Sequence, residues 1–224
     1  MTFRPGHLLD RDAIWAAIDR ERLDLADLLD DLSDREWAHP SLCAGWRVRD
    51  VAAHLALAQM PVGAATAAAL RSRGNFHRMI RDSAVRHAAV PTDRLADEIR
   101  GMAGSRRHAP GISDLEPLLD VLVHGQDIAV PIGRPRTMPL DAVAAAATRV
   151  WTYRWPFSTV WRAPSRLAGL ELVATDIDWS AGAGARVEGP IQALLLLLTG
   201  RTGAAMAHLS GPGVPQLAPA GSSP

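Results

Sequence analysis

The chain has 224 residues, nearly half of them hydrophobic, with 24 basic and 24 acidic residues. A chain of this size can bury a sizeable core, as one large domain or two small ones. Balanced charge argues against a broad nucleic-acid surface, which needs a basic surplus. All 24 basic residues are arginines and the chain has no lysine, so catalysis through a lysine Schiff base is excluded.

Cysteine content and hydropathy indicate what kind of protein this is and where it is located. Cys43 is the single cysteine, so the chain has no internal disulfide framework. The strongly apolar stretch over residues 193–198 is far too short to span a bilayer. The sequence opens without a signal-peptide pattern. We therefore expect a cytoplasmic protein with neither a nucleic acid nor a membrane as its partner.

The first two thirds of the chain predict helices. Apolar residues recur at helical spacing over residues 8–32. Ser33 and Glu36 have the spacing of a capping box, which predicts the start of a short helix. Further helices are predicted over residues 47–59, 64–70, 76–89, 93–102 with Thr92 as the N-cap, 114–130 and 140–153, with loops over 39–45 and 105–113. The pattern indicates a helical bundle that extends to about residue 155.

The character of the chain changes after residue 155. Residues 167–175 partly alternate like a strand, residues 179–184 are rich in turn formers, and residues 185–188 predict a second strand that pairs with the first as a hairpin. An apolar helix over 190–198 and a helical piece over 202–209 follow. The predicted architecture is mainly α: a bundle over residues 1–155, a small α/β segment over 156–217 and a disordered tail over 218–224.

Two predicted helices carry the residues of chemical interest. His54 lies at the edge of the apolar face of the helix over 47–59. On the helix over 114–130, Asp120, His124 and Asp127 are four and then three positions apart and project from one face. Two imidazoles and a carboxylate on facing helices of a bundle form a common site for a divalent metal.

A simpler interpretation of the same spacing stays open. A histidine at the edge of an apolar face is often a hydrogen-bonded core residue, and an acid four residues before a histidine often forms a surface ion pair. Glu116 falls near the same face. In favour of a metal, Asp120 and His124 lie within a strongly apolar helix, where burial of charge is costly without a partner. Asp127 and Asp50 could accept the second imidazole N–H that a metal-bound histidine donates.

These segments carry a resemblance to a known family. The stretch from Gly45 to Leu55 (GWRVRDVAAHL) and the stretch from Asp120 to Ile128 (DVLVHGQDI) resemble two motifs of the mycothiol-dependent maleylpyruvate isomerase family, within the DinB-like superfamily. Residues 174–190, 194–201 and 209–214 are similar to the C-terminal part of that family. The resemblance implies a DinB-like four-helix bundle and a small α/β segment.

The resemblance also implies a metal and a cosubstrate. It implies a divalent ion, zinc by expectation, held by His54, Asp120 and His124, with a position left open for the thiol of mycothiol. The family commonly has glutamate where this chain has Asp120, one methylene shorter. The thiolate would add to a small electrophile, and the adduct would either expel the thiol again, as an isomerase requires, or keep it, as an S-transferase requires.

Four other residues have candidate roles. Trp46 and Arg49 are candidates for binding the cofactor, although a tryptophan at a helix start often packs in the core and Arg49 could simply pair with a neighbour. By resemblance Arg201 is a candidate catalytic residue that binds an anion. Cys43 could be a fourth ligand, but we expect it to pack in its loop.

Two other classes of function remain open at this point. The bundle could be a non-catalytic metal-binding or stress-response module, for which a closed site that includes Cys43 would argue. It could also be a metal-dependent hydrolase, in which bound water attacks. The residue pattern names neither the electrophile nor the metal, and a homodimer is compatible with it.

Overall fold

The computed structural model describes residues 2–4, 9–60, 76–108, 111–134, 136–153 and 163–217. The helix expected over residues 64–70 and the tail expected over 218–224 lie outside these residues. Contacts between Cα atoms divide the chain into one unit over Arg11–Thr137 and a second that combines Met1–Asp10 with Met138–Pro224. Each unit is described by itself.

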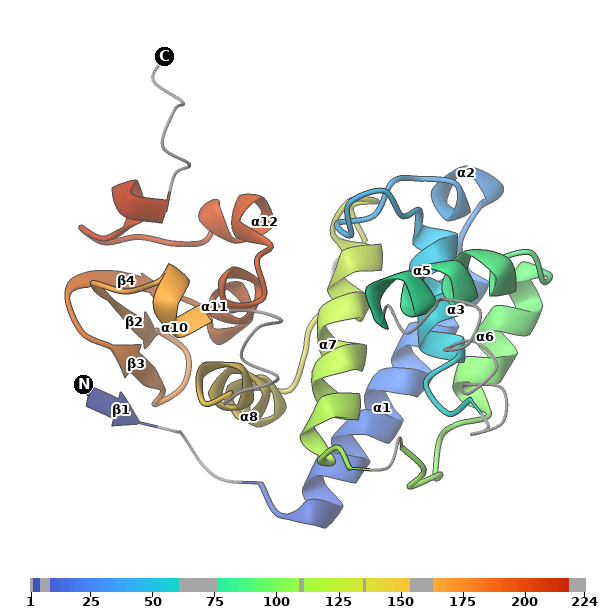
Figure 1. The fold of residues 1–224 in the computed structure, drawn as a ribbon, viewed down its shortest axis with the longest axis horizontal. Coiled ribbons are helices and arrows are strands. Elements are labelled where there is room, and N and C mark those ends of the chain that lie inside the picture. The colour runs from blue at the N-terminus through green and yellow to red at the C-terminus, as the bar shows by residue number, and fades with distance from the viewer. Residues whose placement is uncertain are drawn as a thin grey trace. The chain divides into compact units, whose positions relative to one another are not determined.

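The unit over Arg11–Thr137 is helical, as the sequence predicts (Figure 1). Its helices are α1 (Arg11–Asp30), α2 (Asp34–Trp37), α3 (Val48–Ala56), α5 (Phe76–His87), α6 (Thr92–Arg100) and α7 (Leu115–Ala129). Helix α1 packs against α6 and α7, and α3 packs against the same two helices, which closes a four-helix bundle. The expected bundle is therefore confirmed.

Apolar faces at helical spacing hold this bundle together. The core includes Leu25 and Leu29 of α1, Val51 of α3, Ile99 of α6 and Ile128 of α7, all essentially buried. Burying each such side chain contributes roughly 1.5–3 kcal/mol before entropy is counted. The face predicted for α3 is the one that the helix buries, and this places His54 at its edge.

Helix termini in this unit confirm one sequence prediction and correct another. Ser33 caps α2 and accepts a hydrogen bond from Glu36 N, while the Glu36 carboxylate accepts from Ser33 N, which is the predicted capping box. Thr92 was expected to be the N-cap of α6, but Pro91 occupies that position and Thr92 is the first helical residue. Pro91 fixes its own φ and so favours an extended residue just before the helix.

The second unit combines a small sheet with helices. Its elements are β1 (Thr2–Arg4), α8 (Leu140–Trp151), α10 (Ala163–Arg166), β2 (Leu170–Ala174), β3 (Ser180–Gly182), β4 (Ala185–Gly189), α11 (Ile191–Leu198), α12 (Thr202–Met206) and the short 3-10 helix η1 (Val214–Leu217). The strand order is β1-β3-β2-β4, with β4 parallel to β2 and β3 antiparallel to it. The expected α/β character is confirmed.

The pairing of these strands differs from the predicted hairpin. The two strands foreseen in the sequence, β2 and β4, are parallel, because the turn-rich stretch contains a third strand, β3, that pairs with the other edge of β2. The chain then crosses to the far edge through Gly182 and Gly184, at φ 94° and 133°. A Cβ at Gly184 would lie 1.9 Å from the Gly169 carbonyl oxygen, so only glycine permits this tight crossing.

The boundary between the units also lies elsewhere than expected. The sequence analysis placed the alanine-rich helix over 140–153 in the bundle, up to residue 155, whereas α8 packs against α11 in the second unit. Trp179, before β3, donates a hydrogen bond from Nε1 to Thr148 Oγ1 of α8 at 3.0 Å. The small alanine side chains of α8 let it approach the leucine-rich α11 closely. Helical periodicity predicts which face of a helix is buried but not which element packs against that face.

Among the residues that the structure describes, none of the helices combines the length and apolar character that crossing a membrane requires.

Candidate metal centre

A tight turn and a capped helix position His54. Gly45 adopts φ 77°, which lets the loop reverse ahead of α3. Asp50 then accepts hydrogen bonds from the Arg47 backbone N–H at 2.9 Å and from the Arg47 guanidinium at 3.2 Å, which closes the N-terminus of the helix. Asp50 was expected to orient His54. It is instead committed to the helix N-terminus, where it pairs with Arg47 three residues before it and not with His54 four residues after it.

The predicted stripe on α7 meets His54 across the bundle. His54 Nε2 lies 3.3 Å from Asp120 Oδ1, and His124 Nε2 lies 3.5 Å from the same oxygen. The two imidazole rings are 4.9 Å apart and nearly perpendicular. Three potential ligand atoms from α3 and α7 thus converge, all within 4.8 Å of one another.

The two separations that involve Asp120 fit a tetrahedral metal ion. Two ligand atoms that each lie about 2.05 Å from such an ion are about 3.3 Å apart. The observed 3.3 and 3.5 Å match that value. One oxygen of Asp120 therefore lies within reach of both histidines.

The hydrogen bond that His124 forms with Asp127 leaves its other ring nitrogen available to a cation. His124 Nδ1 lies 2.8 Å from Asp127 Oδ2, whose side chain is fully buried, and an ionised carboxylate can only accept. The proton of a neutral His124 is therefore on Nδ1, and its Nε2 lone pair points toward Asp120. A lone pair and a carboxylate oxygen repel each other unless a proton or a metal lies between them. A carboxylate behind a metal-bound imidazole is the usual supporting arrangement, and Asp127 occupies the place predicted for it.

Charge interactions within the cluster of His54, Asp120 and His124 also favour a bound cation. Burial by itself raises the pKa of Asp120, but the charge and hydrogen bond of His54 outweigh burial and lower that pKa to about 2. Burial by itself lowers the pKa of His54, but the Asp120 carboxylate reverses this and raises it. The cluster thus stabilises positive charge beside an ionised carboxylate, which is also what a divalent cation requires.

Cys43 lies closer to this cluster than the sequence analysis expected. Its thiol donates a hydrogen bond to Asp127 Oδ2 at 3.0 Å, and its sulfur is 3.7 Å from His124 Nδ1. It therefore sits on the Nδ1 side of His124, whereas Asp120 and His54 sit on the Nε2 side. The two ring nitrogens of an imidazole point in different directions, so one metal ion cannot be bound by His124 Nε2 and also lie beside the Cys43 sulfur on the Nδ1 side. This geometry does not favour a closed four-ligand site that includes Cys43. Spacing in sequence gave no signal of this contact, because it joins a loop to a helix 81 residues later.

Glu116 and Trp46 lie near the two motifs but are not among the three converging ligand candidates. Glu116 was noted near the same face of α7, but its carboxylate accepts a hydrogen bond from Ser113 N at 3.0 Å, at the start of the helix. The Trp46 ring lies 5.6 Å from the His54 ring and meets it edge-on, so Trp46 forms part of the wall beside His54.

The two candidate arginines have backbone partners. The Arg49 guanidinium donates to the Ala88 carbonyl and, at 2.6 Å, to the Val90 carbonyl, so it fastens α3 to the turn after α5. Arg201 precedes α12 in the second unit and donates from its guanidinium to the Thr199 carbonyl at 2.6 Å. Its role toward an anion stays a prediction.

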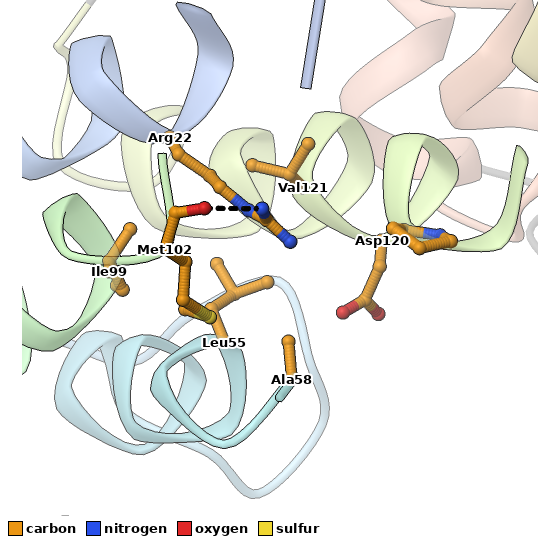
Figure 2. A pocket seen from close by; sticks show the side chains of 8 residues that line it. Arg22, Leu55, Ala58, Ile99, Met102, Asp120 and Val121 are labelled. Carbon is orange, nitrogen blue, oxygen red and sulfur yellow. Dashed lines mark hydrogen bonds between the residues drawn. The ribbon is translucent and has the colours of Figure 1, made fainter. Parts of the chain in front are cut away.

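A small pocket opens beside Asp120 within the bundle. It is lined from all four bundle helices or the residues that directly follow them, and Figure 2 shows the Asp120 carboxylate at one side and the Arg22 side chain reaching toward it from α1. The remaining lining is mainly apolar. Arg22 was not among the residues singled out from the sequence.

Comparison with known proteins bears on the first motif. Residues 18–75 match the family model of the mycothiol maleylpyruvate isomerase N-terminal domain. The match includes most of α1 and all of α3 with His54, and the suspected resemblance is thereby confirmed.

The fold is similar to two solved structures. They are crystal structures of mycothiol-dependent maleylpyruvate isomerase and of a histidine-to-alanine variant of it, each with a TM-score of 0.60 and 13% sequence identity. Each comparison covers 91% of this chain and 93% of the other. At this identity the similarity establishes the fold. None of the curated proteins matches the sequence significantly.

Proposed function

We propose that this protein is a metal-dependent enzyme that uses mycothiol as its cosubstrate and acts on a small electrophile, as an isomerase or an S-transferase. The observation that carries the proposal is the convergence of His54, Asp120 and His124, whose ligand atoms lie within 4.8 Å of one another, with Asp127 behind His124. The matched N-terminal domain family and the similar fold of mycothiol-dependent maleylpyruvate isomerase supply the thiol and the reaction class.

In this proposal His54, Asp120 and His124 hold a divalent cation, for which zinc suits the imidazole and carboxylate donors. When bound, such a cation stabilises a thiolate near neutral pH. Asp127 keeps the proton of His124 on Nδ1, so that Nε2 stays free to bind. Trp46 restricts the movement of the His54 ring. With three protein ligands the cation keeps a position for the thiol, which is the arrangement of a catalytic site and not of a structural one.

The chain needs no nucleophile of its own in this reaction. The thiolate adds to an electrophilic carbon; an isomerase then expels it after rotation about the former double bond, whereas an S-transferase keeps the new C–S bond. This proposal assigns Cys43 no part as a nucleophile; its thiol donates a hydrogen bond to Asp127. Arg201 is proposed to bind an anionic group, as its position after α11 resembles that of the family's anion-binding arginine.

The direct test is mycothiol-dependent conversion of an unsaturated acid by the zinc-loaded protein. Purified protein is mixed with mycothiol and a cis-unsaturated keto acid, and three quantities are followed together: the cis-to-trans conversion, the free thiol and the conjugated double bond. We expect saturable dependence on mycothiol that His54→Ala abolishes. The matched control is His39→Ala, because His39 is exposed and makes only a local contact with the Pro40 carbonyl.

The outcome of this assay separates the three classes of function. Conversion to the other geometric isomer, with the double bond and the free thiol both recovered, indicates an isomerase, and stable loss of both indicates a transferase. Turnover of ester or amide substrates without thiol would instead indicate a hydrolase. Metal-loaded protein that neither consumes nor binds mycothiol contradicts the proposal and favours a non-catalytic module.

A further inference from the structure

His124 lies between two carboxylates, one on each side of its imidazole ring. Its Nε2 lies 3.5 Å from Asp120 Oδ1, on the side of the proposed metal centre. Its Nδ1 lies 2.8 Å from Asp127 Oδ2, on the opposite side, where the sulfur of Cys43 is 3.7 Å away. Each ring nitrogen therefore has atoms beside it that can bind a metal, and the Nδ1 side lies outside the centre described above.

The Nδ1 side holds a compact triangle of atoms that can bind a metal, formed by Cys43, His124 and Asp127 and called here the cysteine cluster. Cys43 Sγ and His124 Nδ1 both contact Asp127 Oδ2, at 3.0 and 2.8 Å. All three atoms lie within 4.8 Å of one another. The Asp127 side chain is fully buried, whereas Cys43 is partly exposed. The cluster therefore has a buried carboxylate at its inner corner and a sulfur that ions from solvent can reach.

The separations within the cysteine cluster accommodate a metal ion as they stand. Bonds of about 2.3 Å to sulfur and about 2.0–2.1 Å to nitrogen and oxygen are typical of zinc. With these lengths, the observed 3.7, 3.0 and 2.8 Å correspond to angles of about 85° to 115° at a common ion. An ion with a filled d shell imposes no geometry of its own, so it tolerates such angles. The sulfur ligand selects soft ions of this kind over magnesium or calcium.

Proton and charge balance also favour a cation in the cysteine cluster. To bind a divalent ion, the Cys43 thiol releases its proton to solvent, and the imidazole of His124 carries its proton on Nε2 instead of Nδ1. The Nε2–H group then faces the Asp120 carboxylate, which is an acceptor. One thiolate and one carboxylate balance both charges of the ion. The centre with His54 has a single carboxylate, so there one positive charge of the ion is left unbalanced.

We propose that Cys43, His124 and Asp127 form a second metal site, which takes a thiophilic cation such as cadmium or excess zinc. The two sites share one imidazole, and a neutral imidazole offers a single lone pair. A cation at Nδ1 leaves the proton on Nε2, where it blocks the centre with His54 and Asp120. The protein therefore binds one cation at a time, and a thiophilic ion in the second site switches off the first. The second site does not rest on the proposed function; its effect on the first centre does.

The test follows cadmium binding through the ultraviolet charge-transfer absorption of a cadmium–thiolate bond. Cys43 is the single cysteine of the chain, so this absorption reports that residue alone. Reduced, metal-free His54→Ala protein is titrated with cadmium, because this variant lacks one ligand of the first centre and keeps all three of the second. Asp127→Asn and Cys43→Ser are introduced into the same background. Asp50→Asn is the matched control, because Asp50 is a buried carboxylate that closes the N-terminus of α3.

We expect the absorption to saturate at about one cadmium ion per chain, since three ligand atoms converge on one point. Asp127→Asn should weaken cadmium binding by about tenfold or more, because even a supporting group of a metal site contributes that much. Asp50→Asn should change it by less than about threefold, since Asp50 shares no partner with the cluster. Cys43→Ser should abolish the absorption.

Two results would overturn the second site. They are absence of the absorption in His54→Ala protein that circular dichroism shows to be folded, and equal cadmium affinity with and without Asp127→Asn. The second result would mean that cadmium binds the thiol of Cys43 alone. If His54→Ala does not fold, Asp127→Asn and Asp50→Asn are compared in the wild-type background, where the absorption still reports Cys43.

A second measurement tests the competition between the sites. Cadmium is added to zinc-loaded wild type, and zinc release and the thiolate absorption are recorded together. We expect the absorption to appear as zinc leaves, because both ions need His124. Absorption that develops while zinc stays bound overturns this exclusion. Cadmium binding by the cysteine cluster in a protein without mycothiol-dependent activity overturns the proposed function and leaves the second site standing, whereas thiol activity without cadmium absorption does the reverse.

Discussion

Replacing Asp127 by asparagine preserves the size of a fully buried side chain but removes its charge. In the wild type, Asp127 Oδ2 accepts from His124 Nδ1 at 2.8 Å. An asparagine can present an N–H group to that nitrogen instead, which moves the imidazole proton to Nε2 and blocks the atom that faces Asp120. We expect zinc affinity to fall although all three ligands remain.

The size of this effect follows from the contact. One hydrogen bond to a charged group contributes about 1.5–3 kcal/mol. Loss of a carboxylate that supports a metal-bound histidine costs about 10- to 100-fold in metal affinity, or about 1.4–2.7 kcal/mol. The two values agree, so we expect Asp127→Asn to bind zinc between about ten and a hundred times more weakly than wild type.

The assay is competition for zinc with a fluorescent chelator near neutral pH. Asp50→Asn is the matched control, because Asp50 is also a buried carboxylate but closes the N-terminus of α3. It should lower stability and leave zinc affinity within about threefold. A folded Asp127→Asn protein with wild-type zinc affinity would refute the assigned support of His124.

Two further predictions concern stability. In metal-free protein, Asp120 has a lowered pKa and His54 a raised one, so their pairing stabilises the fold most between 3.8 and 6.5, the usual pKa values of the two groups. Denaturant titration with a chelator present measures the unfolding free energies of wild type and Asp120→Asn. We expect the difference between them to shrink as pH falls toward 2 or rises past the pKa of His54. A difference that does not change with pH would contradict the pairing. Gly125→Ala should destabilise the protein by about 1–2 kcal/mol, since overpacking outweighs the gain in helix propensity: its Cβ would lie 2.5 Å from Arg136. Gly203→Ala meets nothing within 4 Å, and thermal unfolding should show it unchanged or stabilised.

Local pattern predicted the parts of the structure that depend on local physics. The face of α3 and the stripe on α7 follow from helical periodicity, so His54, Asp120 and His124 could be placed on facing helices in advance. The capping box at Ser33 depends on four consecutive residues and was equally visible.

Features that depend on distant contacts were not predictable in this way. The thiol of Cys43 meets Asp127 only after the loop before α3 folds onto α7. Arg22 reads in the sequence as a polar residue of an amphipathic helix, and only the packed bundle shows that it is buried in a pocket. The parallel pairing of β2 and β4 depends on a three-residue strand of small residues, whose own pattern resembles a turn.

His54 and His124 are proposed to bind one metal ion together. The most direct measurement is metal content by elemental mass spectrometry, on wild type and on the His54→Ala/His124→Ala double variant, both reconstituted with zinc and shown to be folded. We predict about one ion per wild-type chain, since three ligands converge on one point, and none in the variant. Wild type without stoichiometric metal, or a variant that retains it, would contradict the claim.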